Sequence, residues 1–240
     1  MDERAVAIIT GGSGGYGAGI AEVFRDDGVE VYITGRDRQK LEATASRLGV
    51  NAIEADATRA DDWDRVFAQV LAETGRVDYL INNAGGAIKV APLSELADED
   101  ILSTVNVNLT GVILGSKRAA KVMKEQGSGT IVNIGSVVSL EAWPEWTVYS
   151  AAKGGLHQFT KCLYSELRDF GARATLIVPS WGQTDFAANA GLPGSGDEVR
   201  GLSTKPTELG ELVLYCCRLP QHLWLQEAVL WPRVQVVDPL

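Results

Sequence analysis

The sequence predicts an α/β fold: a doubly wound parallel sheet of seven strands with helices on both faces, in a single domain. Short apolar runs alternate with longer amphipathic segments along the chain. The runs are continuously apolar instead of alternating, which is typical of parallel strands buried on both faces. The chain has 240 residues, a length that one large domain can have, and shows no internal repeat or interdomain linker. We therefore expect one domain over residues 1–240.

Each element follows from its apolar pattern. The strands are expected at short apolar runs, because parallel strands are short and need long crossovers, which helices supply. These runs are Val6–Ile9, Val31–Thr34, Asn51–Glu54, Tyr79–Ile81, Ile131–Ile134, Thr175–Val178 and Ala228–Leu230. Helices are expected at segments with helical spacing, among them Leu41–Leu48, Trp63–Glu73, Glu99–Gln126, Val148–Phe170 and Glu208–Arg218. Asn189–Ser203 is too rich in Gly and Pro for a regular element, so we expect a substrate loop at about 185–205.

Charge and composition exclude several function classes. The chain has 22 Lys and Arg against 31 Asp and Glu, a net charge of −9, which argues against nucleic acid and anionic membrane as partners. It has no apolar run long enough to cross a membrane, and an acidic start unlike a signal peptide, so we expect a cytoplasmic protein. Three cysteines and two histidines without ligand spacing predict no metal site.

The first strand runs directly into a glycine-rich turn, Thr10-Gly11-Gly12-Ser13-Gly14-Gly15-Tyr16-Gly17, and an amphipathic segment follows. Glycines permit a tight turn whose N–H groups approach a pyrophosphate, and the start of a helix adds partial positive charge. The turn fits both G-x-G-x-x-G and T-G-x-x-x-G-x-G. It predicts a dinucleotide site because it follows a strand and opens a helix.

Tyr149 and Lys153 are four residues apart, so they share one helix face one turn from each other. A phenol titrates near pH 10, and a neighbouring ammonium favours the phenolate. The pair predicts an acid/base whose pKa is lowered toward neutral pH. Helices also contain such pairs by chance, so the prediction depends on the surrounding motifs.

Those motifs give the pair its context. Asn82-Asn83-Ala84-Gly85 ends the fourth strand, Val107-Asn108-Leu109-Thr110-Gly111 follows, and Asn133-Ile134-Gly135-Ser136 ends the fifth. Together with the glycine turn and Tyr149-x-x-x-Lys153, their order and spacing resemble the short-chain dehydrogenase/reductase (SDR) family, whose fold is Rossmann-like. The resemblance runs from Val6 to about Thr184.

The resemblance implies hydride transfer between nicotinamide and a carbonyl carbon. It assigns Tyr149 to protonate the developing alkoxide and Ser136 to donate a hydrogen bond to the same oxygen. Lys153 would bind the nicotinamide ribose and lower the pKa of Tyr149, and Asn108 would hold a water in a proton relay. Ser139 is a rival for the serine role and Asn106 for the asparagine role.

Further cofactor contacts are implied by the same resemblance. Asp56 would bind the adenine amino group, and Asn83–Gly85 would form a wall beside the cofactor. Pro179 and Thr184 match a motif that grips the carboxamide, whereas Gly182 replaces an aliphatic residue, so we expect apolar packing to be lost there. The expected cofactor contacts are Gly11, Ser13, Gly14, Gly15, Tyr16, Gly17, Arg36, Asp56, Ala57, Asn83, Ala84, Gly85, Tyr149, Lys153, Pro179, Gly182 and Thr184.

The end of the second strand predicts the form of the cofactor. SDRs that use NAD typically have an acid at the position of Gly35, and here Arg36 follows a glycine. A guanidinium can pair with a 2′-phosphate, which a carboxylate would repel. We therefore expect NADP(H) to be preferred and NAD(H) to be possible. Asp37 could also turn toward the ribose, and Arg36 and Arg38 could instead be solvated charges at a helix start.

The expected substrate pocket consists of Val138, Trp143, Trp146, Trp181 and Phe186, which favours an apolar ketone, aldehyde or secondary alcohol. The leading hypothesis is a carbonyl reductase. The alternatives are a 3-oxoacyl-thioester reductase and a non-catalytic NADP-sensing binding protein. Because the long helices pair across a two-fold axis in the family, we expect a homodimer or homotetramer.

Overall fold

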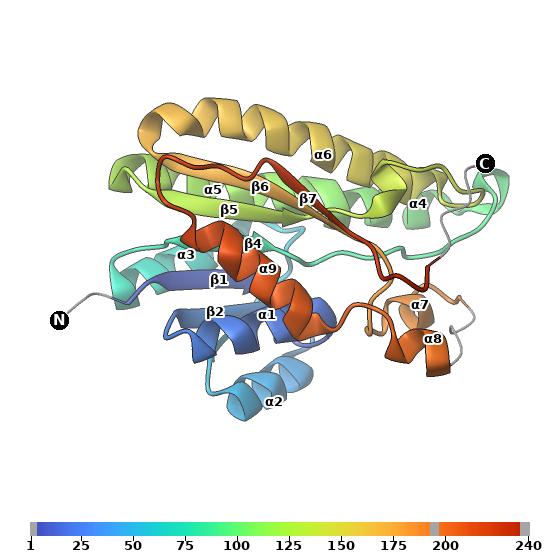
Figure 1. The fold of residues 1–240 in the computed structure, drawn as a ribbon, viewed down its shortest axis with the longest axis horizontal. Coiled ribbons are helices and arrows are strands. Elements are labelled where there is room, and N and C mark those ends of the chain that lie inside the picture. The colour runs from blue at the N-terminus through green and yellow to red at the C-terminus, as the bar shows by residue number, and fades with distance from the viewer. Residues whose placement is uncertain (1–3, 193–196, 236–240) are drawn as a thin grey trace.

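The computed structural model describes residues 4–192 and 197–235, which form one sheet with helices on both faces (Figure 1). The sheet has seven strands in the order β3-β2-β1-β4-β5-β6-β7, and every neighbouring pair is parallel. The chain winds outward from β1 in one direction and from β4 in the other, which confirms the predicted doubly wound, Rossmann-like fold. The strands are β1 (Val6–Thr10), β2 (Glu30–Gly35), β3 (Asn51–Glu54), β4 (Tyr79–Asn82), β5 (Gly129–Ile134), β6 (Ala172–Pro179) and β7 (Glu227–Leu230).

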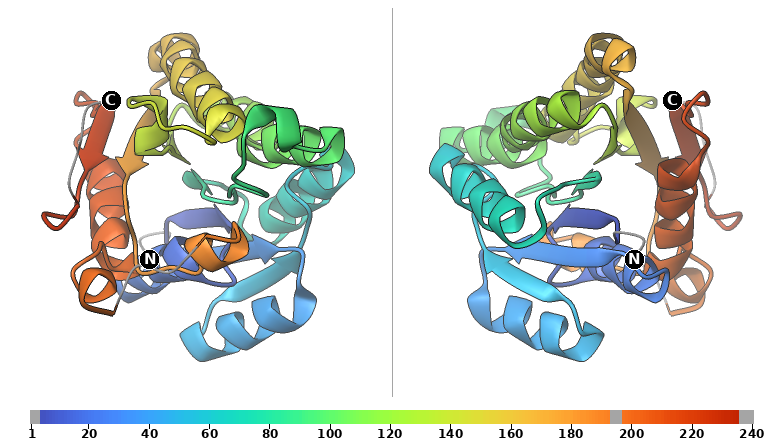
Figure 2. Two further views of the ribbon diagram at one scale, coloured as in Figure 1. Left: turned by 90° about the vertical axis from the view of Figure 1, so that its right-hand side faces the viewer. Right: turned by 90° about the vertical axis from the view of Figure 1, so that its left-hand side faces the viewer.

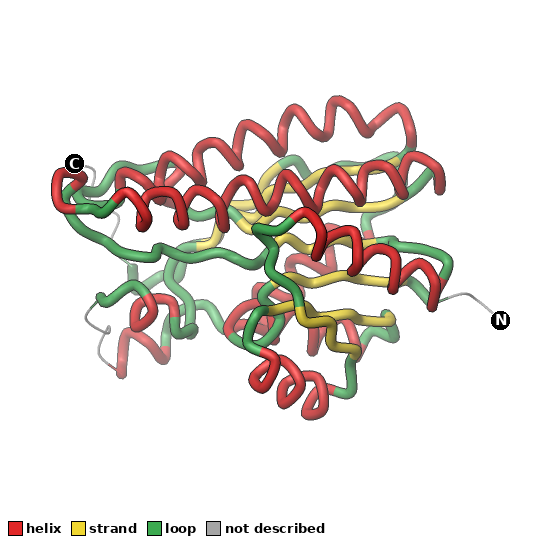
Figure 3. Tube along the Cα trace, turned by 180° about the vertical axis from the view of Figure 1, so that it is seen from behind, coloured by secondary structure: helices red, strands yellow, loops and turns green. Residues whose placement is uncertain are grey.

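Helices cover both faces of the sheet (Figure 2), and a core of buried apolar side chains lies on each face. On one face, α1 (Gly15–Asp26), α2 (Arg38–Leu48) and α9 (Pro206–Arg218) bury side chains such as Phe24, Leu41 and Val213. The other face is covered by α3 (Ala60–Thr74), α5 (Gly111–Gln126) and α6 (Thr147–Leu167), the helices seen in front of the strands in Figure 3. Each of these helices has a buried apolar stripe and an exposed polar face, which is why the sequence pattern located them.

The long segment expected as one helix over Glu99–Gln126 has a local irregularity. It consists of α4 (Asp98–Val105), a π-helical turn (Asn106–Thr110) and α5, without a break between them. The segment Val148–Phe170 similarly becomes α6 and a final 3₁₀ turn (Arg168–Phe170). A π turn inserts a residue into the helical ladder and is often found at functional sites.

The expectation that Asn189–Ser203 holds no regular element is wrong in part. The short helix α7 (Phe186–Asn189) ends at its beginning, and α8 (Asp197–Gly201) forms inside it, both beside the carboxyl ends of the strands in Figure 1. Residues 193–196, which include Pro193 and two glycines, lie outside the described residues. The residues of α8 include neither proline nor an internal glycine, so one turn of helix can form there.

A chain of polar side chains lies buried beneath the carboxyl edge of the sheet. Asn82 Nδ2 on β4 donates to Asn133 Oδ1 on β5 at 2.8 Å and to Ser116 Oγ on α5 at 3.1 Å. Asn133 Nδ2 in turn donates to Thr160 Oγ1 on α6 at 2.9 Å. Buried polar groups are stable only when they are hydrogen-bonded, so these contacts fix two strands and two helices to one another.

No helix in the described parts of the chain is both long and apolar enough to cross a membrane.

Candidate active site

The glycine turn after β1 is braced from beneath by the loop after β4. Asn83 Nδ2 donates to Thr10 O at 2.9 Å, and Thr10 Oγ1 accepts from Asn83 N at 3.0 Å and from Ala84 N at 2.9 Å. A Cβ atom at Gly17 would lie 2.2 Å from Gly11 O, so only glycine permits this approach. At Gly14, by contrast, a Cβ atom would meet nothing within 4 Å. The turn therefore presents backbone at the start of α1, as a bound pyrophosphate requires.

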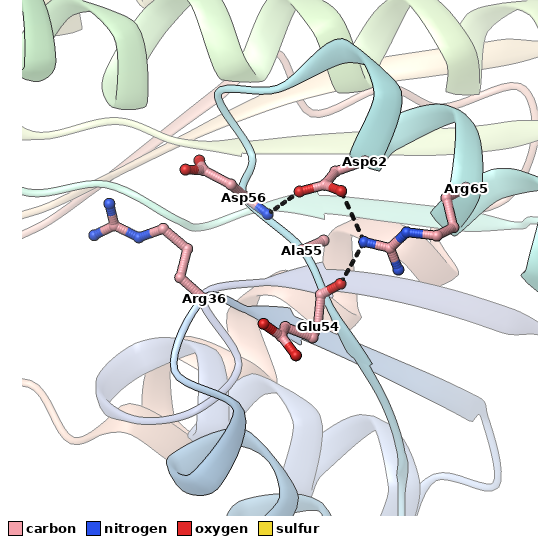
Figure 4. Close-up of a pocket in the computed structure, with 6 residues that line it drawn as sticks. All are labelled: Arg36, Glu54, Ala55, Asp56, Asp62 and Arg65. Carbon is pink, nitrogen blue, oxygen red and sulfur yellow. Dashed lines mark hydrogen bonds and ion pairs between the residues drawn. The ribbon is translucent and has the colours of Figure 1, made fainter.

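A cavity of about 440 Å³ lies where β2 and β3 end (Figure 4). On one side of it, Arg65 donates to Glu54 O at 2.7 Å and to Asp62 at 2.8 Å. Arg36 projects from the other side and has no hydrogen bond or ion pair within the described residues. Its rival Arg38 forms an ion pair with Glu42 at 2.7 Å. Arg36 is thus the arginine available to an anionic ligand.

The residues predicted to bind adenosine line or border this cavity. Asp56 is one of its lining residues, and its Oδ1 accepts from the backbone and the hydroxyl of Thr58 at 2.9 and 2.8 Å. Ala57 follows it, and its carbonyl accepts from Trp63 Nε1 at 2.8 Å. A Cβ atom at Gly35 would be 3.5 Å from Ser13 Oγ, an ordinary contact distance. There is therefore room for a side chain to begin at position 35, and lack of space does not explain the glycine there.

Three predicted catalytic residues meet at the carboxyl end of β5. The side chain of Ser136 faces the Tyr149 hydroxyl and stabilises its ionised form as a hydrogen-bonding group. The rival Ser139 instead donates its hydroxyl to Ser136 O at 2.7 Å. Lys153 Nζ donates to Ile134 O at 2.8 Å and lies 5.7 Å from the centre of the Tyr149 ring. Spacing along α6 thus places the ammonium one turn from the phenol, as expected.

Asn108 lies in the π turn and is fully buried, whereas its rival Asn106 is exposed. Its amide group donates to Gly86 O and Thr104 O, both at 2.8 Å, and accepts from Gly86 N at 3.0 Å. A Cβ atom at Gly85 would lie 2.6 Å from Asn108 Oδ1 and 3.4 Å from Lys153 Nζ. Asn108, Gly85 and Lys153 therefore lie close together.

The pKa of Tyr149 differs from the sequence-based expectation. Burial raises the pKa of Tyr149 above its usual value, and the hydrogen bond from Ser136 opposes that shift without reversing it. Burial also lowers the pKa of Lys153 to about 8. The expected lowering at Tyr149 is absent because both groups are removed from water, and this cost favours their neutral forms. The Tyr149 hydroxyl is therefore protonated at neutral pH.

The predicted pocket residues form an aromatic cluster over Tyr149. The rings of Trp146 and Phe186 are stacked, with centres 6.2 Å apart and planes 7° apart. Each ring also contacts Tyr149, at 5.8 and 5.7 Å between centres. Val138 and Trp143 pack against the same cluster. Trp181 does not belong to it: its side chain is 47% exposed, and its backbone N–H is held by Gln235 on another segment.

The chain is similar to known proteins in both sequence and structure. Residues 5–192 match the sequence pattern of the short chain dehydrogenase family. The chain belongs to this family. The predicted resemblance is thereby confirmed, and the protein is an oxidoreductase that acts on an alcohol or carbonyl group. An uncharacterized oxidoreductase of Staphylococcus saprophyticus is 32% identical to it over 95% of this chain and 97% of its own.

Solved structures of short-chain dehydrogenases resemble it over nearly their whole length. The closed form of serine dehydrogenase with NADP⁺ has a TM-score of 0.89 at 26% identity, covering 98% of both chains. The Thermococcus sibiricus alcohol dehydrogenase with 5-hydroxy-NADP has a TM-score of 0.88 at 28% identity, covering 98% of this chain and 100% of its own. The Brucella melitensis 3-ketoacyl-(acyl-carrier-protein) reductase with NADH has a TM-score of 0.87 at 28% identity, covering 95% of this chain and 96% of its own. These ligands agree with the prediction of NADP(H) preferred and NAD(H) possible.

Two groups that hold the site together, Thr10 and Thr204, are not among the residues predicted from the sequence. Thr10 receives the two backbone N–H groups of the loop after β4, and Thr204 contacts the segment after β6 through its backbone. Thr10 directly precedes the glycines, which was a usable signal. Thr204 had no signal, because its contact depends on how a long segment folds back.

Proposed function

We propose that the protein is an NADP(H)-dependent carbonyl reductase or alcohol dehydrogenase, which transfers hydride between nicotinamide and a ketone, aldehyde or secondary alcohol. One observation supports this most strongly. The buried Tyr149 hydroxyl is hydrogen-bonded to Ser136 and stands one helical turn from the buried Lys153 ammonium. This arrangement can hold a carbonyl oxygen and protonate it in one place.

When bound, the nicotinamide supplies or accepts the hydride. In the reducing direction, Tyr149 gives its proton to the substrate oxygen and becomes the phenolate, while Ser136 donates a hydrogen bond to the same oxygen. Lys153 binds the nicotinamide ribose and stabilises the phenolate with its positive charge. A proton then returns to Tyr149 along Lys153 and a water held at Asn108, which restores the resting site.

The residues present fit a dinucleotide. The glycine turn offers exposed backbone for the pyrophosphate, and the cavity beside β2 and β3 accepts the adenosine end. Arg36, which has no partner within the described residues, faces that cavity and is suited to pair with a 2′-phosphate. The binding of NADP⁺ and 5-hydroxy-NADP by similar structures supports the preference, and the NADH-bound neighbour supports NAD(H) as a weaker alternative.

An uncharged substrate suits the aromatic cluster. Its members, Trp146, Phe186 and the residues around them, contribute apolar side chains, with the Tyr149 hydroxyl as the polar group. A charged substrate would lose its hydration there without a partner. The likeness to a 3-ketoacyl reductase supports the second candidate, a 3-oxoacyl-thioester reductase. A non-catalytic NADP-sensing protein is the third, and the complete set of Asn108, Ser136, Tyr149 and Lys153 argues against it.

The test is the absorbance of the reduced nicotinamide with NADPH and NADH in parallel, over uncharged ketones and 3-oxoacyl thioesters. We expect turnover of ketones with NADPH, slower turnover with NADH, and none in the Tyr149→Phe control. Faster turnover of the thioesters would favour the second candidate. Tight NADPH binding with no turnover of any substrate would favour the third.

We further propose a homodimer or homotetramer assembled through α4, α5 and α6. The exposed faces of α4 and α5 include Leu102, which is 62% exposed, and Ile113, which is 39% exposed. Sedimentation of the wild type and of Leu102→Glu tests this, because a charge at an interface dissociates it. A cytoplasmic location, a small-molecule carbonyl or alcohol substrate, and the lack of nucleic-acid and membrane partners stay predictions.

A further inference from the structure

Gly182, on the segment after β6, has no room for a side chain. A Cβ atom there would lie 2.0 Å from Tyr16 Oη and 2.4 Å from Tyr16 Cζ. Gly182 is not among the glycines with positive φ, so its backbone conformation does not demand glycine. The three atoms nearest to that Cβ position all belong to the Tyr16 side chain, so Tyr16 causes the restriction. The glycine at position 182 predicts a loss of apolar packing there, but in the structure the Tyr16 side chain fills that space.

The Tyr16 hydroxyl also connects two parts of the segment that follows β6. It donates to Ser180 O at 3.5 Å and shares a side-chain hydrogen bond with Thr204. Thr204 N donates to Trp181 O at 3.1 Å, and Gln183 N donates to Thr204 O at 2.9 Å. Tyr16 therefore fixes the glycine turn to both ends of the segment that carries Thr184, the residue predicted to grip the carboxamide.

The position of Tyr16 relative to the catalytic residues indicates which end of the cofactor it serves. The cavity proposed for adenosine lies at the ends of β2 and β3, on one side of β1. In the strand order, β6 lies on the other side of β1. The Tyr16 hydroxyl also lies near enough to Tyr149 for its charge, when ionised, to influence the pKa of that phenol. Next to it, Gly15 would place a Cβ atom 3.4 Å from Thr184. These contacts belong to the nicotinamide end.

We propose that Tyr16 and Gly182 are a matched pair, and that Tyr16 is a positioning residue for the nicotinamide end of the cofactor site. The inference rests on the proposed use of NADP(H). The phenol of Tyr16 replaces a side chain at position 182 and holds the segment carrying Thr184 against the glycine turn. A substitution at either position alone leaves a gap or an overlap, and the paired substitution removes both.

A double-mutant cycle tests this pair through binding. The variants are Tyr16→Leu, Gly182→Val and the two combined, each titrated with NADPH and with ADP-ribose 2′-phosphate, which lacks the nicotinamide. We expect each single variant to weaken NADPH about ten-fold and the combined variant to bind within about three-fold of the wild type. The fragment should bind all four proteins within about two-fold, because Arg36 and the glycines of the turn are unchanged.

Two results would overturn the proposal: equal weakening of NADPH and the fragment, or a combined loss equal to the product of the single losses. If Gly182→Val does not fold, Gly182→Ala replaces it, since its Cβ meets the same ring. Tyr16→Phe separates the ring from the hydroxyl. We expect it to weaken NADPH less than Tyr16→Leu does, because the ring that fills the space at position 182 is kept, and equal weakening by both variants would contradict the role of the ring. Absence of turnover in the wild type would refute the proposed activity, whereas the binding cycle would still decide on the pair.

Discussion

Burial of Lys153 makes a prediction about stability that does not depend on turnover. The side chain is 4% exposed, and burial lowers its pKa from 10.5 to about 8. Between these two pH values the unfolded chain binds more protons at Lys153 than the folded chain does. The free energy of unfolding therefore rises with pH across this window, and the penalty is fully present below pH 8. The difference between the two pKa values corresponds to a loss of about 3 kcal/mol in the free energy of unfolding at pH values well below 8.

Lys153→Met removes the ammonium and keeps a side chain of similar length. It also removes the hydrogen bond to Ile134 O, a constant loss of about 1 kcal/mol. Urea unfolding followed by tryptophan fluorescence, without nucleotide and at one protein concentration, gives the free energy of both proteins from pH 7 to 10.5. We expect the wild type to gain about 3 kcal/mol relative to the variant over this range.

Other groups titrate in the same window, and the comparison removes them. Burial raises the pKa of Cys216 to about 11, for example, which lowers the stability of both proteins as pH rises. Taking the difference between wild type and variant isolates Lys153. A difference that stays constant from pH 7 to 10.5 would refute the reasoning, because Lys153 would then keep its ordinary pKa inside the fold.

Four further outcomes are expected. Tyr149→Phe lowers turnover about 10²- to 10⁴-fold while NADPH still binds in a fluorescence titration; retained turnover would exclude Tyr149 as the acid. Arg36→Ala raises the Kd for NADPH about 10- to 100-fold and that for NADH less than about three-fold, and equal effects would contradict a phosphate contact. Gly17→Ala, whose Cβ would lie 2.2 Å from Gly11 O, loses about 1–3 kcal/mol in thermal unfolding; unchanged stability would show that the turn can relax. Alcohol oxidation needs the Tyr149 phenolate, so its kcat/KM rises about ten-fold per pH unit from pH 7 toward the raised pKa, and a flat profile would argue against that base.

The fold and the side chains that meet at the candidate site could be predicted from the sequence because their signals are local. Each strand is a short apolar run, and its end is marked by the motif that follows it, as Ser136 follows β5. Tyr149 and Lys153 need only the helical repeat to face each other. The choice of Ser136 over Ser139 depended on spacing, and the side chain of Ser136 is the one that acts on the Tyr149 hydroxyl.

Other features depend on contacts between distant segments and had no local signal. The exclusion of a side chain at Gly182 requires the ring of Tyr16, far away in the chain. The π turn at Asn108 interrupts an otherwise ordinary helical pattern. Burial raises the pKa of Tyr149, whereas the nearby ammonium of Lys153 was expected to lower it. The sequence shows that the two residues are neighbours but not how deeply the phenol is buried, so it could not predict which effect is larger.

The buried contacts among Asn82, Asn133 and Thr160 have a consequence for how the site tolerates change. A slip of one residue between two paired strands would turn Asn133 to the opposite face and break both of its bonds. Asn83 and Ser136 come shortly after these strands, so the same bonds set how far the cofactor wall stands from the proton donor. Apolar residues of matching size in place of Asn82, Asn133 and Thr160 would keep the sheet folded but would no longer fix the distance between the cofactor wall and the proton donor. Activity would then decline without a loss of folded structure.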